Sequence, residues 1–256
     1  MRESVNHRYY ETLGVAEEYG VDCDVTAAEE LILDLLRHDA RSESLLEVGI
    51  GGGRTTPHLL AIAKDYVGVD YSKRMVELCR QKFNSTFMVC DARNMSAFEG
   101  ERFSTVVFWG NGIDEVNPSD RLLILNEINR VLKKDGIFTF SSHNLAWSRI
   151  PDYMLDGFSL SRKTIRDNAM RAGTYVLGLV VRIWSTIRRK GYAVLWEYEE
   201  PEKMAVPRYY IEQEAQVRQL LDAGFDEVKV FASDGSPLTA KNGRADYLVF
   251  YSARKR

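Results

Sequence analysis

The stretch that decides the fold is Leu45-Leu-Glu-Val-Gly-Ile-Gly-Gly-Gly-Arg-Thr-Thr56. Its first residues form a short apolar run that ends in glycine, which is typical of a buried strand, and a helical pattern follows. Glycine lets a chain turn sharply between a strand and a helix, and it lets a ligand lie against the backbone. The stretch therefore predicts a strand, a ligand-binding glycine loop and a helix, in preference to a glycine-rich turn without a ligand.

The glycine spacing separates this loop from two common nucleotide-binding loops. A dinucleotide-binding loop, G-x-G-x-x-G, that begins at Gly49 needs its third glycine at position 54, and Arg54 occupies that position. A P-loop needs Gly-Lys-Ser/Thr after its glycines, and the sequence has no such triplet there. A nicotinamide-dependent oxidoreductase is therefore the weaker enzyme hypothesis for this chain.

Strand and helix patterns alternate on both sides of the glycine loop, which predicts an α/β fold with a mainly parallel sheet covered by helices on both faces. Ser72 is placed to cap a helix, and Asp135-Gly136 is placed to form a turn. In the helix 118–133, Leu122, Leu125, Ile128 and Leu132 are expected on one face. The expected strands are 44–49, 65–70, 86–90, 103–109, 137–141, 226–232 and 245–252; the expected helices are 27–37, 54–64, one from 72 onward, 118–133 and 212–223.

Composition excludes several classes of protein. The chain has 256 residues, with 34 Lys and Arg against 37 Asp and Glu, a formal net charge of −3, and 45% hydrophobic residues. These values are ordinary for a globular chain, and they argue against a protein that coats nucleic acid. The length suits one domain, 1–256, with an elaboration.

The N-terminus, the cysteines and the histidines lead us to expect a cytoplasmic protein without a metal. The first seven residues lack the apolar stretch of a signal peptide, and the most apolar run, 175–181, is far shorter than a transmembrane helix. Three cysteines and four scattered histidines have neither zinc nor disulfide spacing. We therefore expect free thiols in a reducing compartment, no transmembrane segment and no bound metal.

Two more strand ends carry acidic residues. Asp70 ends the second expected strand, 70 − 49 = 21 residues after Gly49, close to the spacing of about 20 that a ribose-binding acid shows. Asp91 follows the third expected strand. A carboxylate at such a position can accept two O–H hydrogen bonds, and charge-assisted hydrogen bonds are strong ones. Asp70 alone could be a solvated acid, but with the glycine loop it indicates a cofactor site.

Together these motifs resemble the signatures of the class I S-adenosylmethionine-dependent methyltransferases. Glu47, Gly49, Gly51 and Gly53 match that family's E/D-x-G-x-G-x-G, and the resemblance covers about 45–144 and 208–253. It implies a Rossmann-like, doubly wound sheet of seven strands with the last one antiparallel. It also implies an enzyme that transfers a methyl group from S-adenosylmethionine to a small molecule by direct in-line displacement, leaving S-adenosylhomocysteine.

The resemblance also implies roles for particular residues around the cofactor. Asp70, with Tyr71 beside it, would hold the ribose, while Asp91 and Ala92 would hold the adenine. The methionine part would lie against the end of the fourth strand, and an N-terminal tyrosine would close over it. The remaining residues with a predicted cofactor contact are Glu47, Gly49, Gly51, Gly53, Trp109, Asn111 and Tyr9. For Trp109 a place in the core, and for Tyr9 simple lid packing, are the alternatives.

His143 is the candidate catalytic residue. It stands at the end of the fifth expected strand, and open α/β sheets bind ligands beyond the carboxyl ends of their strands. An imidazole there could take a proton from a hydroxyl or a protonated amine. The alternative is that His143 only bonds a loop or orients the acceptor.

Residues 145–206 interrupt the alternation between the fifth and sixth strands. Between positions 149 and 191, nine basic residues stand against three acidic ones, an excess of 9 − 3 = +6, which leaves −3 − 6 = −9 for the rest of the chain. An amphipathic helix over 176–187 and an added strand over 191–198 are expected. We interpret 145–206 as an α/β lid over the acceptor, and 1–40 as an N-terminal helical cover. The lid could select an anionic acceptor, or its basic helix could be solvated or touch a membrane surface or a partner.

Two further alternatives remain open at this point. The chain could be a binding or scaffold protein that keeps the cofactor site without catalysis. A nucleic-acid methyltransferase is disfavoured, because the fourth strand ends in Phe108-Trp-Gly-Asn111 and not in Asn/Asp-Pro-Pro-aromatic. We expect a small-molecule substrate and no nucleic acid, and the sequence does not predict an oligomeric state.

Overall fold

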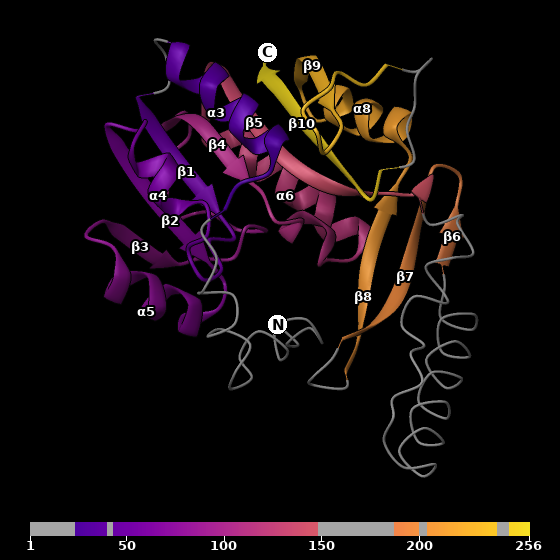
Figure 1. Cartoon of the computed structure of the whole chain (residues 1–256), viewed down its shortest axis with the longest axis horizontal. Coiled ribbons are helices and arrows are strands. Elements are labelled where there is room, and N and C mark those ends of the chain that lie inside the picture. Colours follow the sequence, from indigo (N-terminus) through magenta and orange to yellow (C-terminus); the bar gives the residue numbers. More distant parts are fainter. Residues whose placement is uncertain (1–23, 40–42, 148–186, 200–203, 240–245) are drawn as a thin grey trace.

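The computed structural model describes residues 24–39, 43–147, 187–199, 204–239 and 246–256 (Figure 1). Tyr9 and the segment 148–186, which holds most of the expected amphipathic helix, lie outside the described residues. In the parts of the chain that are described, no helix is long and apolar enough to cross a membrane.

The helices begin where their capping residues predict. Thr26 and Glu29 form a reciprocal capping box at the start of α3 (Ala27–His38). The Ser72 hydroxyl accepts the Met75 N–H at the start of α5 (Lys73–Lys82), which confirms the expected cap. Asn117 caps α6 (Pro118–Val131) by accepting from the Asp120 N–H. The other described helices are α4 (Thr56–Leu60), the 3-10 turn η1 (Gly112–Asp114) and α8 (Gln213–Asp222).

Seven strands form the expected Rossmann-like sheet, in the order β3-β2-β1-β4-β5-β10-β9. The strands from β3 to β5 are parallel, and β10 runs antiparallel to both β5 and β9. The predicted seven-stranded core with an antiparallel last strand is therefore confirmed. Its strands are β1 (Ser44–Val48), β2 (Asp65–Asp70), β3 (Thr86–Val89), β4 (Phe103–Phe108), β5 (Leu132–Asn144), β9 (Phe225–Phe231) and β10 (Leu248–Lys255).

The described part of the insertion extends this sheet. β8 (Met204–Ile211) lies parallel to the end of β5, with His143 opposite Tyr210 and Asn144 opposite Ile211. β7 (Tyr192–Glu199) pairs with β8, and β6 (Ile187–Arg189) pairs with β7, both antiparallel. The strand expected over 191–198 is confirmed as β7. Ile187, expected at the end of the amphipathic helix, instead begins β6.

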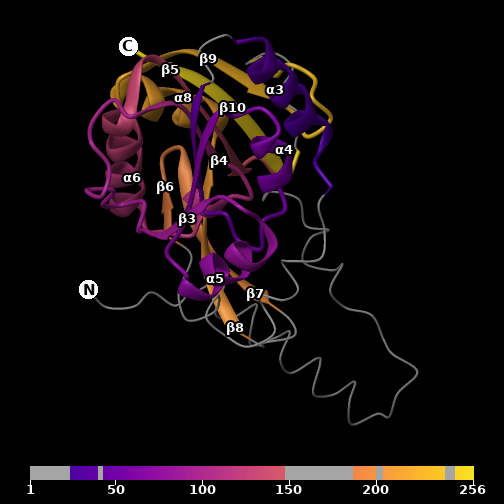
Figure 2. The same ribbon diagram turned by 90° about the vertical axis from the view of Figure 1, so that its left-hand side faces the viewer.

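Helices cover both faces of the sheet, and two hydrophobic clusters hold the layers together (Figure 2). Successive residues of a strand point to opposite faces, so Leu46 packs in the cluster with α6 and α8, while Leu45 packs in the cluster with α3, α4 and α5. Both residues are fully buried. This doubly wound arrangement is the one that the strand–helix alternation predicts.

Three local expectations were wrong. The helix expected over 54–64 is only the five residues Thr56–Leu60, because the glycine loop continues through residue 55. The helix expected to reach residue 133 ends at Val131, and Asp135, at φ 61, bends the chain within β5. Leu122, expected on one face with Leu125 and Ile128, is 47% exposed while those two are buried, because α6 turns Arg121 inward instead.

Candidate active site

The three signature glycines share a backbone conformation but differ in their surroundings. All have positive φ: 66° at Gly49, 51° at Gly51 and 86° at Gly53. A Cβ atom at Gly49 would lie 2.7 Å from Phe108 Cε2, and one at Gly53 would lie 2.5 Å from Phe83 Cε2, so both glycines permit close packing. A Cβ atom at Gly51 would meet nothing within 4 Å. Gly51 is therefore the glycine whose backbone borders open space that a ligand could enter.

Asp70 joins the glycine loop to the end of β2. Its Oδ2 accepts the Gly51 N–H at 3.0 Å, and its Oδ1 accepts the Ser72 N–H at 2.8 Å. The carboxylate is buried and lies at the carboxyl ends of two neighbouring parallel strands, β1 and β2. Tyr71 follows it directly and is half-buried. The structure thus brings Gly51 and Asp70 together, as the sequence motifs imply.

Glu47 anchors the start of α4 to β1. Its buried carboxylate accepts hydrogen bonds from the hydroxyls of Thr55 at 2.5 Å, Thr56 at 2.8 Å, and Tyr66. Burial raises the pKa of Glu47, although these hydroxyls oppose the shift. These contacts make Glu47 a support of the glycine loop, and a direct contact with cofactor stays a prediction.

Asp91 is held by an arginine that the motif analysis missed. Arg93 Nε lies 3.0 Å from each Asp91 oxygen, and its Nη2 lies 2.6 Å from Oδ2. The Arg93 Nη1 reaches Asp120 of α6 at 2.6 Å. Ala92 packs at the margin of the cluster that contains α6. Arg93 therefore fixes the orientation of the carboxylate that is predicted to hold the adenine.

Trp109 and Asn111 follow β4 but have different surroundings. Trp109 is buried in the cluster with α3, and its indole N–H donates to the Thr139 hydroxyl at 3.2 Å. This is the core position that was the alternative for Trp109. Asn111, at φ 61, donates its backbone N–H to the Ser141 hydroxyl at 3.1 Å. Its buried Oδ1 has no hydrogen-bond partner among the described residues.

His143 lies at the end of β5, as expected, and is bonded to a carboxylate. Its Nδ1 is 2.7 Å from Asp114 Oδ2, and its backbone N–H donates to the same oxygen at 2.7 Å. His143 is 1% exposed, and its Nε2 is buried without a partner within the described chain. The rings of Tyr210 and Tyr247 pack against the imidazole at centroid distances of 4.9 Å and 5.0 Å.

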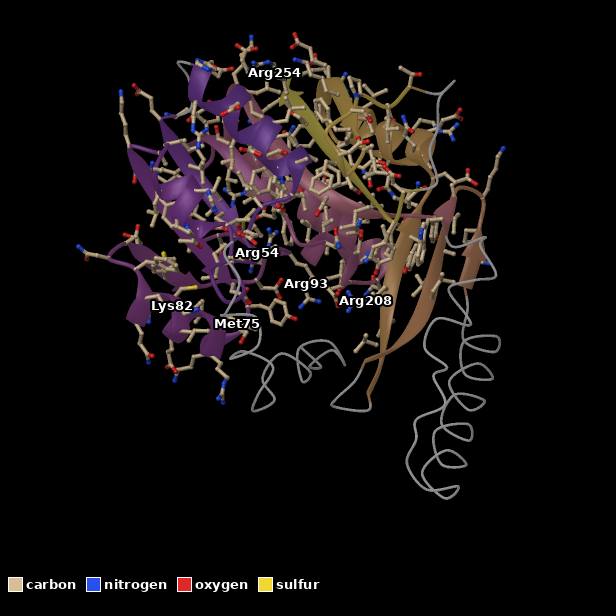
Figure 3. The ribbon with its side chains drawn as sticks, in the orientation of Figure 1. Arg54, Met75, Lys82, Arg93, Arg208 and Arg254 are labelled. Carbon is tan, nitrogen blue, oxygen red and sulfur yellow. The ribbon has the colours of Figure 1, made fainter. Side chains whose placement is uncertain are left out.

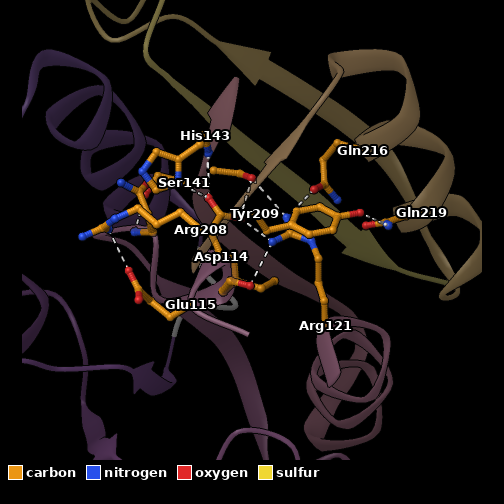
Figure 4. Close-up of polar contacts among 12 residues, drawn as sticks. Asp114, Glu115, Arg121, Ser141, His143, Arg208, Tyr209, Gln216 and Gln219 are labelled. Carbon is orange, nitrogen blue, oxygen red and sulfur yellow. Dashed lines mark hydrogen bonds and ion pairs between the residues drawn. The ribbon is translucent and has the colours of Figure 1, made fainter. Parts of the chain in front are cut away.

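Asp114 is at the centre of a buried polar cluster (Figure 4). Its Oδ1 accepts from the Ser142 hydroxyl at 2.8 Å and forms an ion pair with Arg121, and neither charged side chain is exposed. Arg121 also donates to the carbonyl of Ile113 at 2.9 Å and to Gln216 Oε1 at 2.5 Å. Burial raises the pKa of Asp114, but Arg121 and His143 outweigh that effect, so its net direction is downward.

A second ion pair connects the insertion to this region. Arg208 of β8 contacts Glu115, the residue after η1, at 2.7 Å, and both side chains are mostly buried. Figure 3 shows Arg208 on the β8 side of the molecule and Arg93 nearer its centre. β8, which begins at the end of the insertion, therefore contributes a cation close to the segment that carries Asp114.

Sequence reasoning found the glycines, Asp70, Asp91 and His143 but missed their supporting residues, Arg93, Asp114, Arg121 and Arg208. One signal was available: Asp114 follows the fourth strand as His143 ends the fifth, and neighbouring parallel strands bring their ends together. Arg121 carried no signal, because a basic residue in an amphipathic helix is normally on the solvated face. Among the described residues, no group of three or more His, Cys, Asp or Glu side chains could hold a metal.

The chain is similar to known proteins in sequence and in fold. A family model described as a methyltransferase domain matches residues 45–136. An uncharacterised protein of Methanocaldococcus jannaschii is 31% identical over 101 residues, covering 40% of this chain and 37% of that protein. The chain thus spans less than half the length of the curated relatives that it matches.

Solved structures share the whole fold. An S-adenosylmethionine-dependent methyltransferase from Clostridium acetobutylicum has a TM-score of 0.63 at 12% identity, covering 97% of this chain and 96% of that chain. The glycopeptide N-methyltransferase MtfA, complexed with S-adenosylhomocysteine, has a TM-score of 0.56 at 19% identity, with 92% of each chain covered.

Residues 45–136 thus match a methyltransferase domain, and the fold around them is shared with S-adenosylmethionine-dependent methyltransferases of known structure. The resemblance seen in the sequence motifs is confirmed at this level.

Proposed function

We propose that this chain is an S-adenosylmethionine-dependent methyltransferase that acts on a small molecule. The observation that carries the proposal is the contact between Gly51 and Asp70. A backbone that borders open space and a buried carboxylate meet at the carboxyl ends of adjacent parallel strands, where open α/β sheets bind nucleotides. Glu47 and the close-packed glycines at 49 and 53 keep that loop in place.

The residues present suit the cofactor. The open space at Gly51 admits a group that lies against the backbone, and the Asn111 Oδ1, without a partner in the described chain, suits a donor such as an ammonium group. We assign the ribose to Asp70 and Tyr71, and the adenine to Asp91 and Ala92. We assign the methionine part to Asn111 and not to Trp109, because Trp109 packs in the core. When bound, S-adenosylmethionine supplies a methyl group that is activated because its leaving group is a neutral thioether.

We further propose that the acceptor is a small, anionic molecule that binds beside the end of β5. The excess positive charge over 149–191 supports an anionic acceptor, and the position of His143 at the end of β5 supports its place. One fold neighbour is named a glycopeptide N-methyltransferase, MtfA, and that name supports an acceptor other than nucleic acid. His143 is our candidate for the group that contacts the acceptor.

We propose that the enzyme is cytoplasmic, because its described cysteines are free thiols. Cys79 and Cys90 are free, and burial raises the pKa of Cys79 to about 12. A thiol with such a pKa is protonated and unreactive at neutral pH. Free, unreactive thiols suit a reducing compartment.

Calorimetric titration of the full chain with S-adenosylhomocysteine, and in parallel with reduced nicotinamide dinucleotide, tests the proposed cofactor. We expect saturable binding of S-adenosylhomocysteine and none of the nicotinamide. The absence of S-adenosylhomocysteine binding at millimolar concentration would overturn the proposal. Binding without methyl transfer from tritiated S-adenosylmethionine to any probe acceptor would instead support the scaffold alternative.

A further inference from the structure

Two buried polar atoms at the ends of β4 and β5 have no partner among the described residues: Asn111 Oδ1 and His143 Nε2. Leaving a buried polar group unsatisfied is energetically unfavourable, so such atoms in native proteins call for an explanation. Asn111 is bonded to Ser141, and His143 is two residues further along, on the same face of β5. Both atoms therefore border the region where the sheet is expected to bind its ligands.

The contact with Asp114 determines which nitrogen of His143 carries the proton. An ionised carboxylate only accepts hydrogen bonds, and Asp114 Oδ2 lies 2.7 Å from Nδ1. Nδ1 must therefore carry the hydrogen, and in the neutral imidazole Nε2 is left with a bare lone pair. The backbone N–H of His143, donating to the same oxygen, prevents the ring and the carboxylate from separating.

Arg121 keeps Asp114 ionised and stationary. The two fully buried side chains form an ion pair, and Arg121 is itself held by Gln216 of α8 and by the carbonyl of Ile113. The other titratable groups that face the imidazole are Tyr210 of β8 and Tyr247, just ahead of β10. Within this set, Asp114 is the group placed to stabilise a positive charge on His143.

Resting on the function proposed above, we propose that Asp114 is a positioning residue that holds His143 with its bare Nε2 toward the acceptor. The acceptor atom would then be one that must lose a proton, a hydroxyl oxygen or the nitrogen of a protonated amine. In this step the O–H or N–H bond breaks, its electron pair stays on the acceptor atom, and the proton moves to Nε2. The resulting imidazolium is balanced by the Asp114 carboxylate.

Nitrogen-15 NMR of the imidazole rings tests the arrangement directly, because it distinguishes a protonated ring nitrogen from a bare one. The chain has only four histidines, so His143→Gln assigns the relevant resonances, and His38→Gln, at an exposed position in the last turn of α3, is the matched control. We expect a protonated Nδ1 and a bare Nε2 in His143. In Asp114→Asn the proton is expected to move toward Nε2.

A protonated Nε2 in the unaltered chain would overturn the inference. So would an unchanged tautomer in a folded Asp114→Asn chain. If Asp114→Asn does not fold, the unaltered chain still decides, because His143→Gln leaves the ion pair with Arg121 intact. Failure to bind S-adenosylhomocysteine would overturn the proposed function, whereas a wrong tautomer with intact binding would overturn this inference alone.

Methyl transfer from tritiated S-adenosylmethionine to a phenol, an amine and a thiol gives the second readout. For the phenol and the amine, His143→Gln should lower kcat by about 10²–10⁴-fold. Binding of S-adenosylhomocysteine should not change. Equal turnover of the phenol and the amine by His143→Gln and by the His38→Gln control would contradict the inference.

Discussion

The backbone N–H of Gly51 donates to the carboxylate of Asp70 at 3.0 Å and so joins the glycine loop to the end of β2. The two residues are 19 positions apart in the chain. Their contact exists because β1 and β2 are adjacent and parallel, with Val48 opposite Val69 at their carboxyl ends. The Gly51–Asp70 contact and the buried cluster around Asp114 lead to the following predictions.

Gly49→Ala should mainly reduce stability, whereas Gly51→Ala should mainly reduce ligand affinity. Gly49→Ala combines a positive φ with a contact of 2.7 Å to Phe108, so it should destabilise the fold by more than about 2 kcal/mol. Gly51→Ala meets nothing within 4 Å, so it should cost only about 1–2 kcal/mol of stability. It should nevertheless weaken S-adenosylhomocysteine binding by about tenfold or more, because its methyl group enters the ligand space.

Thermal unfolding and calorimetric titration of both variants check this prediction. Gly235→Ala, at φ +81° in the segment after β9, is the control for backbone strain; its Cβ atom would lie 3.3 Å from the carbonyl oxygen of Ala27. Equal binding by Gly51→Ala and the Gly235→Ala control would show that no ligand lies against residue 51.

Removing either partner of the Asp114–Arg121 pair should destabilise the protein strongly. Both side chains are fully buried, and breaking such a pair by removing one partner costs about 3–5 kcal/mol. Arg121→Met combined with Asp114→Asn should cost less than the sum of the single changes, since no buried charge is left over. Urea unfolding of the four chains measures this; additive losses would contradict the pairing.

The same pair predicts a pH dependence of stability. The pKa of Asp114 is lowered in the folded protein, because the attraction of Arg121 and His143 exceeds the effect of burial. The stabilisation is therefore complete above the unfolded-state pKa of the carboxyl group, and it is lost as pH falls through the lower, folded-state pKa. The difference in the free energy of unfolding between the unaltered chain and Asp114→Asn should shrink in acid. A difference that stays constant down to pH 2 would refute this assignment.

Arg93→Gln should affect binding more than stability. The contacts of Arg93 with Asp91 and Asp120 are about one quarter exposed, so they contribute no more than ~1 kcal/mol to stability after solvent screening. Without Arg93, Asp91 loses its fixed orientation, and S-adenosylhomocysteine affinity should fall by about threefold to tenfold. Arg102→Gln, which breaks the exposed pair with Asp65, is the control. Identical affinities for S-adenosylhomocysteine in the two variants would contradict the assignment of Asp91 to the cofactor site.

Most of the core fold could be predicted from the sequence, because its signals are local. Apolar runs, a capping serine at position 72 and glycines between strand and helix specify the elements, and the alternation specifies a parallel sheet. The short α4 and the early end of α6 could not be predicted in this way. Glu47 secures Thr55 in the loop, and β5 begins at Leu132, so tertiary contacts override the local pattern at both sites.

The site was predictable where strand ends carry a distinctive residue, and not where a supporting residue comes from elsewhere. Asp70 and His143 end strands, so their places follow from the topology. Arg121 reaches Asp114 from α6, and Arg208 reaches Glu115 from an added strand. These partners depend on packing between elements that are distant in sequence, and side-chain chemistry alone does not single them out.

The central claim is that Gly51 and Asp70 form part of the binding site for S-adenosylmethionine. It is tested most directly by titrating S-adenosylhomocysteine into the unaltered chain, Asp70→Ala and Asp70→Asn. Asp65→Asn, at the exposed start of the same strand, is the matched control. Hydrogen bonds to a charged group are worth about 1.5–3 kcal/mol, so both Asp70 variants should remain folded and bind at least about tenfold more weakly. Asp65→Asn should bind as the unaltered chain does. Unchanged affinity in a folded Asp70→Ala chain would contradict the account.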